Sequence, residues 1–378
     1  MTVTPPLPRA ADDARVLRAG AVLTIDLAAI VRNWTTLAAQ VRPARCAAVV
    51  KADAYGLGAA HVAPALAAAG CDSFFVAHLE EGIALRRILG HSTRIAVLHG
   101  PMPGTEDDFP AHDLIPVLNS MPQVAAFAGL ARRSGHRLPA ILQSDTGMAR
   151  FGLTLEELDA LLPAGTLDSL DVVLHMSHLA CADTPAHPAN AAQQAAFMAA
   201  RARLPGIPAS LSASSGIFLG PAFHFDLVRP GAALYGIAPQ AGQPNPLRPV
   251  VRLEGRVVQV RQVPAGTAVG YGHTATTSAA AQLATVGVGY ADGFLRSLSN
   301  VGSAWHRGVR LPLVGRVSMD SIVLDASALP AGTLGPGDPV DLLGPDQDLD
   351  ALARAAGTIG YELLTSLGSR YARRYIGG

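Results

Sequence analysis

Eight short apolar segments alternate with alanine- and leucine-rich segments of helical character between about residues 21 and 240. The apolar segments lie at 46–51, 73–78, 94–100, 114–119, 139–145, 171–178, 208–214 and 225–236. They are apolar on both faces, which is typical of parallel strands that are covered by helices. Eight successive strand–helix units in about 220 residues predict a TIM-type (β/α)8 barrel rather than an open sheet.

Four of the intervening segments have a clear helical pattern, at 26–41, 61–70, 79–90 and 190–204. Asp26 stands where the first of these helices begins, and aspartate is a favoured N-cap residue. The helices between the strands therefore support the barrel prediction.

The character of the chain changes after the segment 238–249, APQAGQPNPLRP, which predicts a linker. Beyond it, alternating segments punctuated by glycine and proline predict a mainly β domain, and one terminal helix is expected over 349–368. We therefore predict an N-terminal tail and leading strand over 1–20, the barrel over 21–245 and the β domain over 246–378.

The composition excludes several classes of protein. The 378 residues are 49% hydrophobic and carry no net charge, which predicts a large core and no nucleic-acid or anionic-membrane partner. Three widely spaced cysteines predict neither a disulfide framework nor a metal site, so we expect no bound metal and a reducing compartment. No membrane span or signal-peptide pattern is found, and we expect a cytoplasmic protein.

Polar residues follow several of the predicted strands, where barrel enzymes place their chemistry. We expect one rim to carry Lys51, the segment 144–150, His175, His178, Ser212, Ser214, Ser215, Gly216, Arg229, Gly231 and Ala232. Any one of them could be an ordinary loop residue, but the barrel topology brings the whole set together.

Lys51 is the only lysine of the chain, beside 28 arginines. Coding bias explains the excess of arginine, and a chance surface lysine is the plain alternative for Lys51. Chemically, however, a lysine amine can lose its proton and condense with an aldehyde, and a guanidinium cannot. A sole lysine at a barrel rim is therefore what a Schiff-base enzyme needs.

Small residues follow the seventh and eighth predicted strands, in SASSGIF (212–218) and RPGAALYG (229–236). Barrels commonly bind phosphate at this place through backbone N–H groups, although serine and glycine clusters also form plain turns. An aldehyde-reactive lysine together with a phosphate site predicts pyridoxal 5′-phosphate (PLP) as cofactor.

Seven segments of the chain form an ordered set of motifs. The first is AVVKADAYGLG (48–58), and the others are DTGMARFG (145–152), HLACAD (178–183), VRPGAALYG (228–236), VGYG (269–272), VGYADG (288–293) and VGRVSMD (314–320). In this order they resemble the motifs of the alanine racemases. The resemblance extends over about residues 21–376. It implies a PLP-binding barrel, a C-terminal β domain, and a homodimer in which each active site is completed by the partner's β domain.

The resemblance also implies roles for individual residues. Lys51 and Tyr271 of the second subunit would be the two acid/base groups that exchange the Cα proton on opposite faces, which is the requirement of any racemisation. The implied cofactor contacts are Lys51, Tyr55, Arg150, His178, Ser215, Arg229, Gly231, Ala232 and, at the end of the chain, Ser369. Arg150 and the backbone N–H of Met319 would bind the substrate carboxylate, and Asp183, Tyr290, Arg296, Arg316 and Asp320 would line an entrance corridor.

Three positions depart from the family pattern. Gln143 stands where many members have a carbamylated lysine that orients the arginine, so an amide, a water or an anion would have to support Arg150 instead. Ser369 replaces a tyrosine that reaches the phosphate, and Ser214 replaces an asparagine. We expect these changes to alter cofactor affinity or substrate range and to leave catalysis intact.

The function implied is racemisation of L- and D-alanine, which supplies D-alanine for peptidoglycan or serves alanine catabolism. The alternatives are a racemase for other small amino acids such as serine, a PLP-dependent amino-acid decarboxylase of similar architecture, and a PLP-binding protein without activity. The attached β domain with Tyr271, and the set VGYG, GYADG and SMD, argue against the last two.

Overall fold

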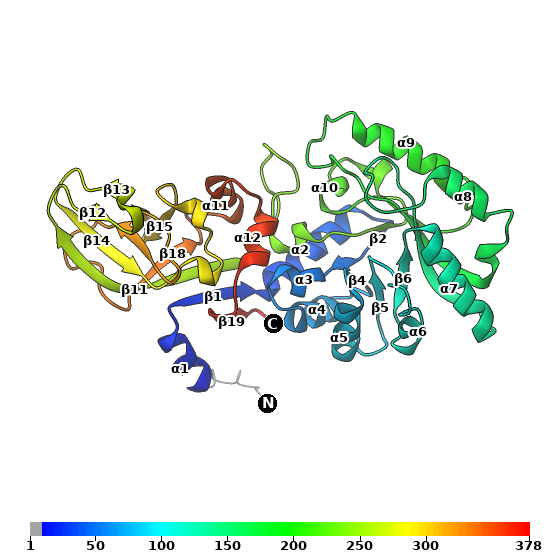
Figure 1. The fold of residues 1–378 in the computed structure, drawn as a ribbon, viewed down its shortest axis with the longest axis horizontal. Coiled ribbons are helices and arrows are strands. Elements are labelled where there is room, and N and C mark those ends of the chain that lie inside the picture. The colour runs from blue at the N-terminus through cyan, green and yellow to red at the C-terminus, as the bar shows by residue number, and fades with distance from the viewer. Residues whose placement is uncertain (1–9) are drawn as a thin grey trace. The chain divides into compact units, whose positions relative to one another are not determined.

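The computed structural model describes residues 10–378, which separate into two compact units. One unit is Leu27–Arg248, and the other joins the segment that ends at Asp26 to Pro249–Gly378. Figure 1 shows helices arranged around strands in the first unit and mainly strands in the second. The predicted fold class, a (β/α)8 barrel followed by a mainly β domain, is confirmed.

Seven parallel strands of the barrel unit form one sheet, in the order β3–β4–β5–β6–β7–β8–β9. They are β3 (Ala48–Val49), β4 (Ser73–Val76), β5 (Arg94–Val97), β6 (Ile115–Leu118), β7 (Leu138–Gln143), β8 (Leu170–Met176) and β9 (Ala209–Ser210). The eighth strand, β10 (Leu227–Val228), pairs in parallel with β2 (Arg45–Cys46), which precedes β3 in the first predicted strand. A parallel bridge between Ala213 and Arg229 connects the end of this last strand to the segment after β9, so the eight strands close a ring.

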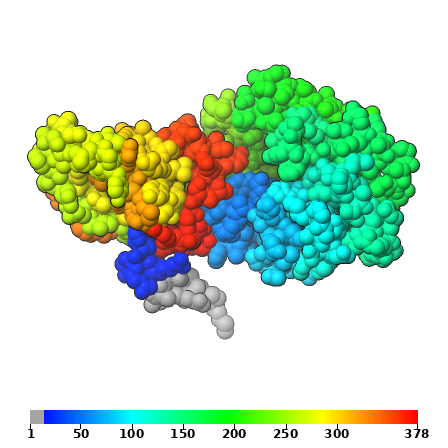
Figure 2. All heavy atoms as spheres, in the orientation of Figure 1, coloured from blue at the N-terminus to red at the C-terminus, as the bar shows by residue number. Residues whose placement is uncertain are grey.

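Helices follow the strands as predicted. They are α2 (Leu27–Gln40), α4 (Ala59–Ala68), α5 (Leu79–Leu89), α6 (Asp108–Ala111), α7 (Met121–Ser134), α8 (Leu155–Leu161), α9 (Ala189–Arg201) and α10 (Ser214–Ile217), with the short turns η1 (Thr166–Ser169), η2 (Pro221–Phe223) and η3 (Ala232–Tyr235). The four predicted helices correspond to α2, α4, α5 and α9, each within three residues at either end. In the space-filling view of Figure 2, the cyan and green segments form a closely packed outer surface of the barrel unit.

Burial on both faces explains why the barrel strands are so apolar. All four residues of β4, SFFV, are buried, and Phe74 and Phe75 are among the largest fully buried side chains. One face of each strand packs inside the ring and the other against the helices, so neither face meets water.

The second unit is built on a sheet with the strand order β16–β15–β18–β11–β1–β19. Two further strands extend it, because β14 pairs with β11 and β17 pairs with β14. Its strands are β1 (Ala21–Asp26), β11 (Val251–Val263), β14 (Ala281–Val286), β15 (Ser303–His306), β16 (Val309–Pro312), β17 (Ile322–Asp325), β18 (Pro339–Leu343) and β19 (Ala372–Ile376). A separate hairpin joins β12 (Ala268–Val269) to β13 (Ala275–Thr276). The remaining elements are α1 (Ala10–Arg18), η4 (Tyr271–His273), η5 (Tyr290–Asp292), η6 (Arg296–Leu298), α11 (Leu349–Ala356) and α12 (Gly360–Ser366).

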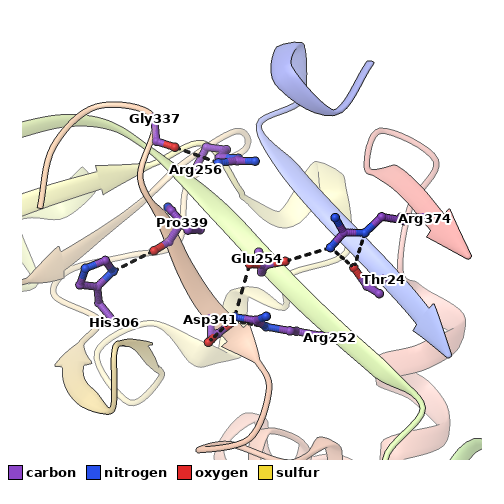
Figure 3. A network of polar contacts seen from close by, with 9 residues as sticks. All are labelled: Thr24, Arg252, Glu254, Arg256, His306, Gly337, Pro339, Asp341 and Arg374. Carbon is purple, nitrogen blue, oxygen red and sulfur yellow. Dashed lines mark hydrogen bonds and ion pairs between the residues drawn. The ribbon is translucent and has the colours of Figure 1, made fainter. Parts of the chain in front are cut away.

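Charged side chains connect the strands of this sheet, as Figure 3 shows. Arg252 of β11 binds Asp341 of β18 at 2.7 Å, and Arg374 of β19 lies 3.6 Å from Glu254 and donates to Thr24 of β1 at 2.9 Å. The network thereby joins β1 and β19, from the two ends of the chain, to the middle of the β unit.

Three expectations about the chain ends need correction. The segment 21–26 belongs to the β unit and not to the barrel, because β1 pairs with β11 and β19. Of the expected tail, residues 1–9 lie outside the described part of the chain, whereas residues 10–18 form helix α1.

The expected terminal helix over 349–368 is two helices, α11 and α12, and a strand follows them. Gly357, with φ of 71°, ends α11 in the left-handed conformation that glycine adopts without a steric penalty. Among residues 10–378, none of the helices combines the length and the apolar character that crossing a membrane requires.

Arg86 binds backbone segments on one side of the barrel, and its substitution tests how much these contacts stabilise the fold. Its guanidinium is buried in α5 and donates to the carbonyl oxygens of Gly90, Thr93 and Asp113 at 2.5, 2.9 and 2.5 Å. Truncation would leave these carbonyls without their donor in a buried place. We predict that Arg86→Ala lowers the free energy of unfolding by about 2–4 kcal/mol, measured by chemical denaturation.

Arg87 is the matched control, because it is the next residue of the same helix and is exposed. Arg87→Ala should change the free energy of unfolding by no more than about 0.5 kcal/mol. Equal losses in the two variants would show that the carbonyl contacts of Arg86 do not stabilise the barrel.

Candidate active site

Lys51 begins a left-handed turn directly after the first strand. Residues Ala52 to Tyr55 have φ between 52° and 55°, and Gly56 has φ of 80°. For residues other than glycine this conformation costs roughly 1–2 kcal/mol each, so the surroundings must hold it. Inside the turn, the N–H of Ala54 donates to Val50 and that of Gly56 donates to Ala52, at 2.9 and 2.7 Å.

A carboxylate from the next helix holds the start of this turn. Glu81 of α5 accepts from the N–H of Ala52 at 2.7 Å with one oxygen, and from the N–H groups of Ala77 and His78 at 2.7 and 3.1 Å with the other. Glu81 thus connects the turn after β3 to the end of β4.

Four cationic or basic side chains gather at the rim around this turn. Burial, and then the positive charge of Arg150, lower the pKa of Lys51 from its usual range. Burial, together with Arg229, Arg150 and Lys51, lowers the pKa of His178 to about 3, so His178 is neutral near pH 7. Among residues 10–378, no carboxylate forms an ion pair with Lys51, Arg150 or Arg229.

Arg229 lies at the centre of this group and is almost fully buried. Its guanidinium donates to the hydroxyl of Ser210 and, at 2.6 Å, to the carbonyl oxygen of Ser177. Burial lowers the pKa of Arg229 only to about 10, so it stays charged at neutral pH. A buried cation with neutral partners can still donate to a neutral acceptor.

His178 is fixed through its backbone by helix α9. Gln193 donates to the carbonyl oxygen of His178 at 3.0 Å and accepts from the N–H of Ala180 at 2.8 Å. Nearby, His175 is fully buried, and its Nε2 is 2.9 Å from the hydroxyl of Ser144. His175 therefore belongs to the interior of the barrel and is not part of the rim.

The segments after β9 and β10 form a narrow cradle. The hydroxyl of Ser214 accepts from the N–H groups of Gly231 and Ala233 at 3.0 and 3.1 Å. A Cβ at Gly231 would lie 2.4 Å from the hydroxyl oxygen of Tyr55, so only glycine fits there.

Of the two backbone donors expected in this cradle, only one is available. The N–H of Gly231 is already used by Ser214, whereas that of Ala232 has no partner among the described residues. The half-buried hydroxyl of Ser215 likewise makes no hydrogen bond within the described chain. The Tyr55 ring packs against the Tyr235 ring at a tilt of 35°, with ring centroids 4.7 Å apart, and its hydroxyl oxygen lies beside Gly231.

Arg150 is exposed, with its guanidinium 5.5 Å from the centre of the Phe151 ring. Gln143 is buried and donates to the carbonyl oxygen of Phe151 at 3.4 Å, so its amide supports the loop and not the guanidinium of Arg150. A shallow recess of about 330 Å³ adjoins Arg150 and Phe151 and reaches His99 and Asn119. Asp183, which also belongs to the barrel unit, is exposed, and its carbonyl oxygen accepts a hydrogen bond from the N–H of Ala241 at 2.9 Å.

The remaining expected site residues lie in the β unit. Tyr271 stands in the turn η4, and 72% of its side chain is exposed. Its turn packs against Arg316, because a Cβ at Gly272 would lie 3.0 Å from the Arg316 guanidinium. Asn300 fixes both segments, accepting from the N–H of Gly315 at 2.7 Å and donating to Thr274 at 3.3 Å.

Two further loops of the β unit lie side by side. The N–H of Tyr290 donates to the carbonyl oxygen of Ser318, and that of Ala291 to the carbonyl oxygen of Met319, both at 3.0 Å. Met319 is exposed, and within residues 10–378 its own N–H has no acceptor. Asp320 pairs with Arg370 at 2.6 Å.

Arg296 and Ser369 are both exposed. Ser299 connects the Arg296 turn to the neighbouring loop, since its hydroxyl donates to the carbonyl oxygen of Arg296 at 2.6 Å and accepts from the N–H of Val317 at 3.0 Å. Tyr371 is buried, and among the described residues its hydroxyl has no partner, so it is not an exposed substitute for the tyrosine that the resemblance leads one to expect at Ser369.

The structure therefore gathers the expected residues into two groups, one in each unit. The barrel group is Lys51, Tyr55, Arg150, His178, Ser215, Arg229, Gly231 and Ala232, and the β-unit group includes Tyr271, Tyr290, Arg316, Met319 and Asp320. Glu81, Gln193 and Asn300 were not among the sequence predictions. The sequence does carry a signal for Glu81, because a glutamate three residues after the N-cap position, here His78, can cap the start of a helix.

Comparisons with known proteins agree over nearly the whole chain. Residues 25–239 match the family model "Alanine racemase, N-terminal domain", and residues 250–375 match "Alanine racemase, C-terminal domain". A catabolic alanine racemase of Mesorhizobium japonicum is 54% identical over 95% of this chain and 94% of its own length. An alanine racemase of Rhodospirillum rubrum is 53% identical over 95% of this chain and 97% of its own length.

A solved structure gives the same result. The alanine racemase of Bartonella henselae, crystallised with covalently bound pyridoxal phosphate, superposes with a TM-score of 0.92 at 44% identity, over 95% of this chain and 100% of that one. With family matches in both units and relatives above 50% identity, the chain belongs to the alanine racemase family.

Proposed function

We propose that this chain is a PLP-dependent enzyme that interconverts L- and D-alanine by a two-base mechanism. The observation that carries the proposal is the setting of Lys51, the only lysine. Its amine lies at the barrel rim, has a lowered pKa, and has no carboxylate paired with it among the described residues. Such an amine loses its proton more readily than a surface lysine and can react with an aldehyde.

The residues of the barrel rim fit PLP. Ala232 offers an N–H and Ser215 a hydroxyl that have no partner among the described residues, and the Tyr55 hydroxyl adjoins the same cradle, which a Cβ at Gly231 would fill. Arg229 offers a buried donor that is paired with no carboxylate of residues 10–378. When bound, PLP supplies an aldehyde that condenses with amines and a ring that withdraws electrons from Cα.

Arg229 restricts the chemistry by keeping its own protons. Because its pKa remains near 10 despite burial, the Arg229 guanidinium is a hydrogen-bond donor at neutral pH and does not transfer its proton. Facing the ring nitrogen of PLP, Arg229 would leave that nitrogen unprotonated and so weaken electron withdrawal by the ring, which would favour return of the Cα proton over side reactions. His178, neutral near pH 7, adds no further charge.

Two groups have to exchange the Cα proton from opposite faces. We assign Lys51 to one face and Tyr271 to the other, with Tyr271 supplied by the β unit of a second copy in a homodimer. The exposure of Tyr271 in the single chain supports this assignment, because a phenol on the surface can reach a partner's site. Arg150 and the unused N–H of Met319 would bind the substrate carboxylate.

We further propose that Asp183, Tyr290, Arg296, Arg316 and Asp320 line the entrance to this shared site, and that Ser369 stands near the phosphate. Asp320 is held by Arg370, and Arg316 packs on the Tyr271 turn, so these polar groups have fixed positions in the β unit. A narrow, charged entrance favours a small zwitterion over larger amines.

The direction of the reaction in the cell is a separate question. The two enantiomers have equal free energies in water, so the enzyme accelerates both directions equally and supply or removal sets the flux. Two similar relatives, from Mesorhizobium japonicum and Agrobacterium fabrum, are catabolic alanine racemases. Their similarity favours a role in alanine catabolism over supply of D-alanine for peptidoglycan.

A racemisation assay over a panel of L-amino acids tests the activity. We predict that the full chain with PLP converts L-alanine to D-alanine with a turnover on the order of 10–1000 per second, faster than it converts L-serine. Faster conversion of serine would point to a broader racemase. Loss of carbon dioxide from the substrate instead of racemisation would point to a decarboxylase.

Mixed dimers test the shared site. Lys51→Ala and Tyr271→Phe should each lose at least about 100-fold in racemisation when pure. Mixed in equal amounts and allowed to exchange subunits, half of the dimers are mixed, and each has one intact site of two. We therefore predict recovery of about a quarter of the wild-type activity, and no recovery if each subunit carries a complete site.

A further inference from the structure

Glu81 occupies an unusual position beside the lysine. Its two carboxylate oxygens accept three backbone N–H groups, at 2.7 Å from Ala52, 2.7 Å from Ala77 and 3.1 Å from His78. Ala52 is the residue directly after Lys51 and the first of the left-handed turn, with φ of 52°. The carboxylate therefore holds the strained turn at the point where it leaves Lys51.

The charge of Glu81 is also unusual among its neighbours. The groups that face the Lys51 amine are Arg150 from the loop after β7, His99 after β5, His178 after β8, and Glu81 on α5. Within the described part of the chain, Glu81 is the one carboxylate that shifts the pKa of Lys51, and it raises that pKa, whereas Arg150 lowers it. The chain thus places one negative charge among several basic groups.

We propose that Glu81 is a positioning residue for Lys51, which holds the left-handed turn against the end of β4 and keeps a proton available on the Lys51 amine. The inference rests on the proposed function, in which Lys51 both gives and takes a proton. A carboxylate that is fully used by backbone N–H groups cannot itself transfer the proton, so its effect on Lys51 is through position and charge.

The test measures the Lys51 amine directly in the full chain after removal of the cofactor. A brief treatment with a limiting amount of acetic anhydride is carried out at a series of pH values, and acetylated Lys51 is measured by peptide mass spectrometry. Because the chain has a single lysine, the α-amino group is the one other amine that reacts, and it lies on a different peptide, so mass spectrometry reads Lys51 separately from all other acetylated groups.

We predict that Glu81→Gln displaces the rate profile to lower pH and speeds acetylation near pH 7 by roughly threefold or more, because an amine without its counter-charge is more often neutral. The matched control is Glu80→Gln, which removes the same charge from the neighbouring, exposed position of α5. Its profile should coincide with the wild type. Coincidence of the Glu81→Gln profile with the wild type, or equal displacement by both variants, would overturn the proposal.

A second variant separates the effect of the Glu81 charge from its effect on the conformation of the turn. In the double variant Glu81→Gln with Ala52→Gly, glycine adopts the left-handed conformation without the Cβ penalty, so the turn can hold without the full set of hydrogen bonds. We expect the double variant to show the same displaced profile as Glu81→Gln. A return to the wild-type profile would mean that Glu81 acts through shape alone and would contradict the proposed effect of its charge.

The experiment is independent of racemisation, since neither cofactor nor alanine is present. A chain that fails to racemise alanine but shows the displaced profile would contradict the proposed function alone. A chain that racemises alanine but shows no displacement would contradict only the assignment of Glu81.

Discussion

Burial of basic groups close to one another at the barrel rim is the constraint on which the site depends. Burial first, and then the charge of Arg150, lowers the pKa of Lys51, and burial together with Arg229, Arg150 and Lys51 lowers the pKa of His178. On an exposed surface, solvent and salt would screen these charges from one another, and the Lys51 amine would keep its proton at neutral pH. Here the ring of strands and the helices around it hold the groups together, and the free energy of folding offsets the repulsion. The result is a lysine that can give up its proton and an arginine that cannot.

The two units contribute different things. The barrel supplies buried, rigid positions: Arg229 lies between two backbone segments, and the Tyr55 ring packs against the Tyr235 ring. The β unit supplies exposed groups on tightly held turns, such as Tyr271 beside Arg316. This division suits a site shared between subunits, in which one surface presents a base and the other holds the reacting molecule.

Much of this could be predicted from the sequence, for physical reasons. Apolar segments predicted the strands, because these strands are buried on both faces. The ends of the strands predicted the rim, so the position of Lys51 followed from topology alone. The exchange of β1 into the β unit could not be seen, because pairing partners far apart in sequence leave no local pattern. Likewise, the break between the two terminal helices depends on the left-handed conformation of Gly357. In the sequence this glycine cannot be told from one that is tolerated inside a helix.

The site shows the same division between local and distant information. Ser215 and Arg229 follow the seventh and eighth strands of the barrel, β9 and β10, as the order of the apolar segments predicts. Side chains that act across elements, such as Glu81 on the Lys51 turn or Asn300 between two loops, were not predicted. The use of the Gly231 N–H by Ser214 was also invisible, because a hydroxyl in a serine-rich turn has several possible partners.

Reduction of the purified protein with borohydride tests the central claim most directly. If Lys51 holds PLP, the sample absorbs as a Schiff base, the band is lost on reduction, and mass spectrometry finds the phosphopyridoxyl group on the Lys51 peptide alone. A protein that remains colourless after incubation with PLP, with Lys51 unmodified after reduction, would contradict the account.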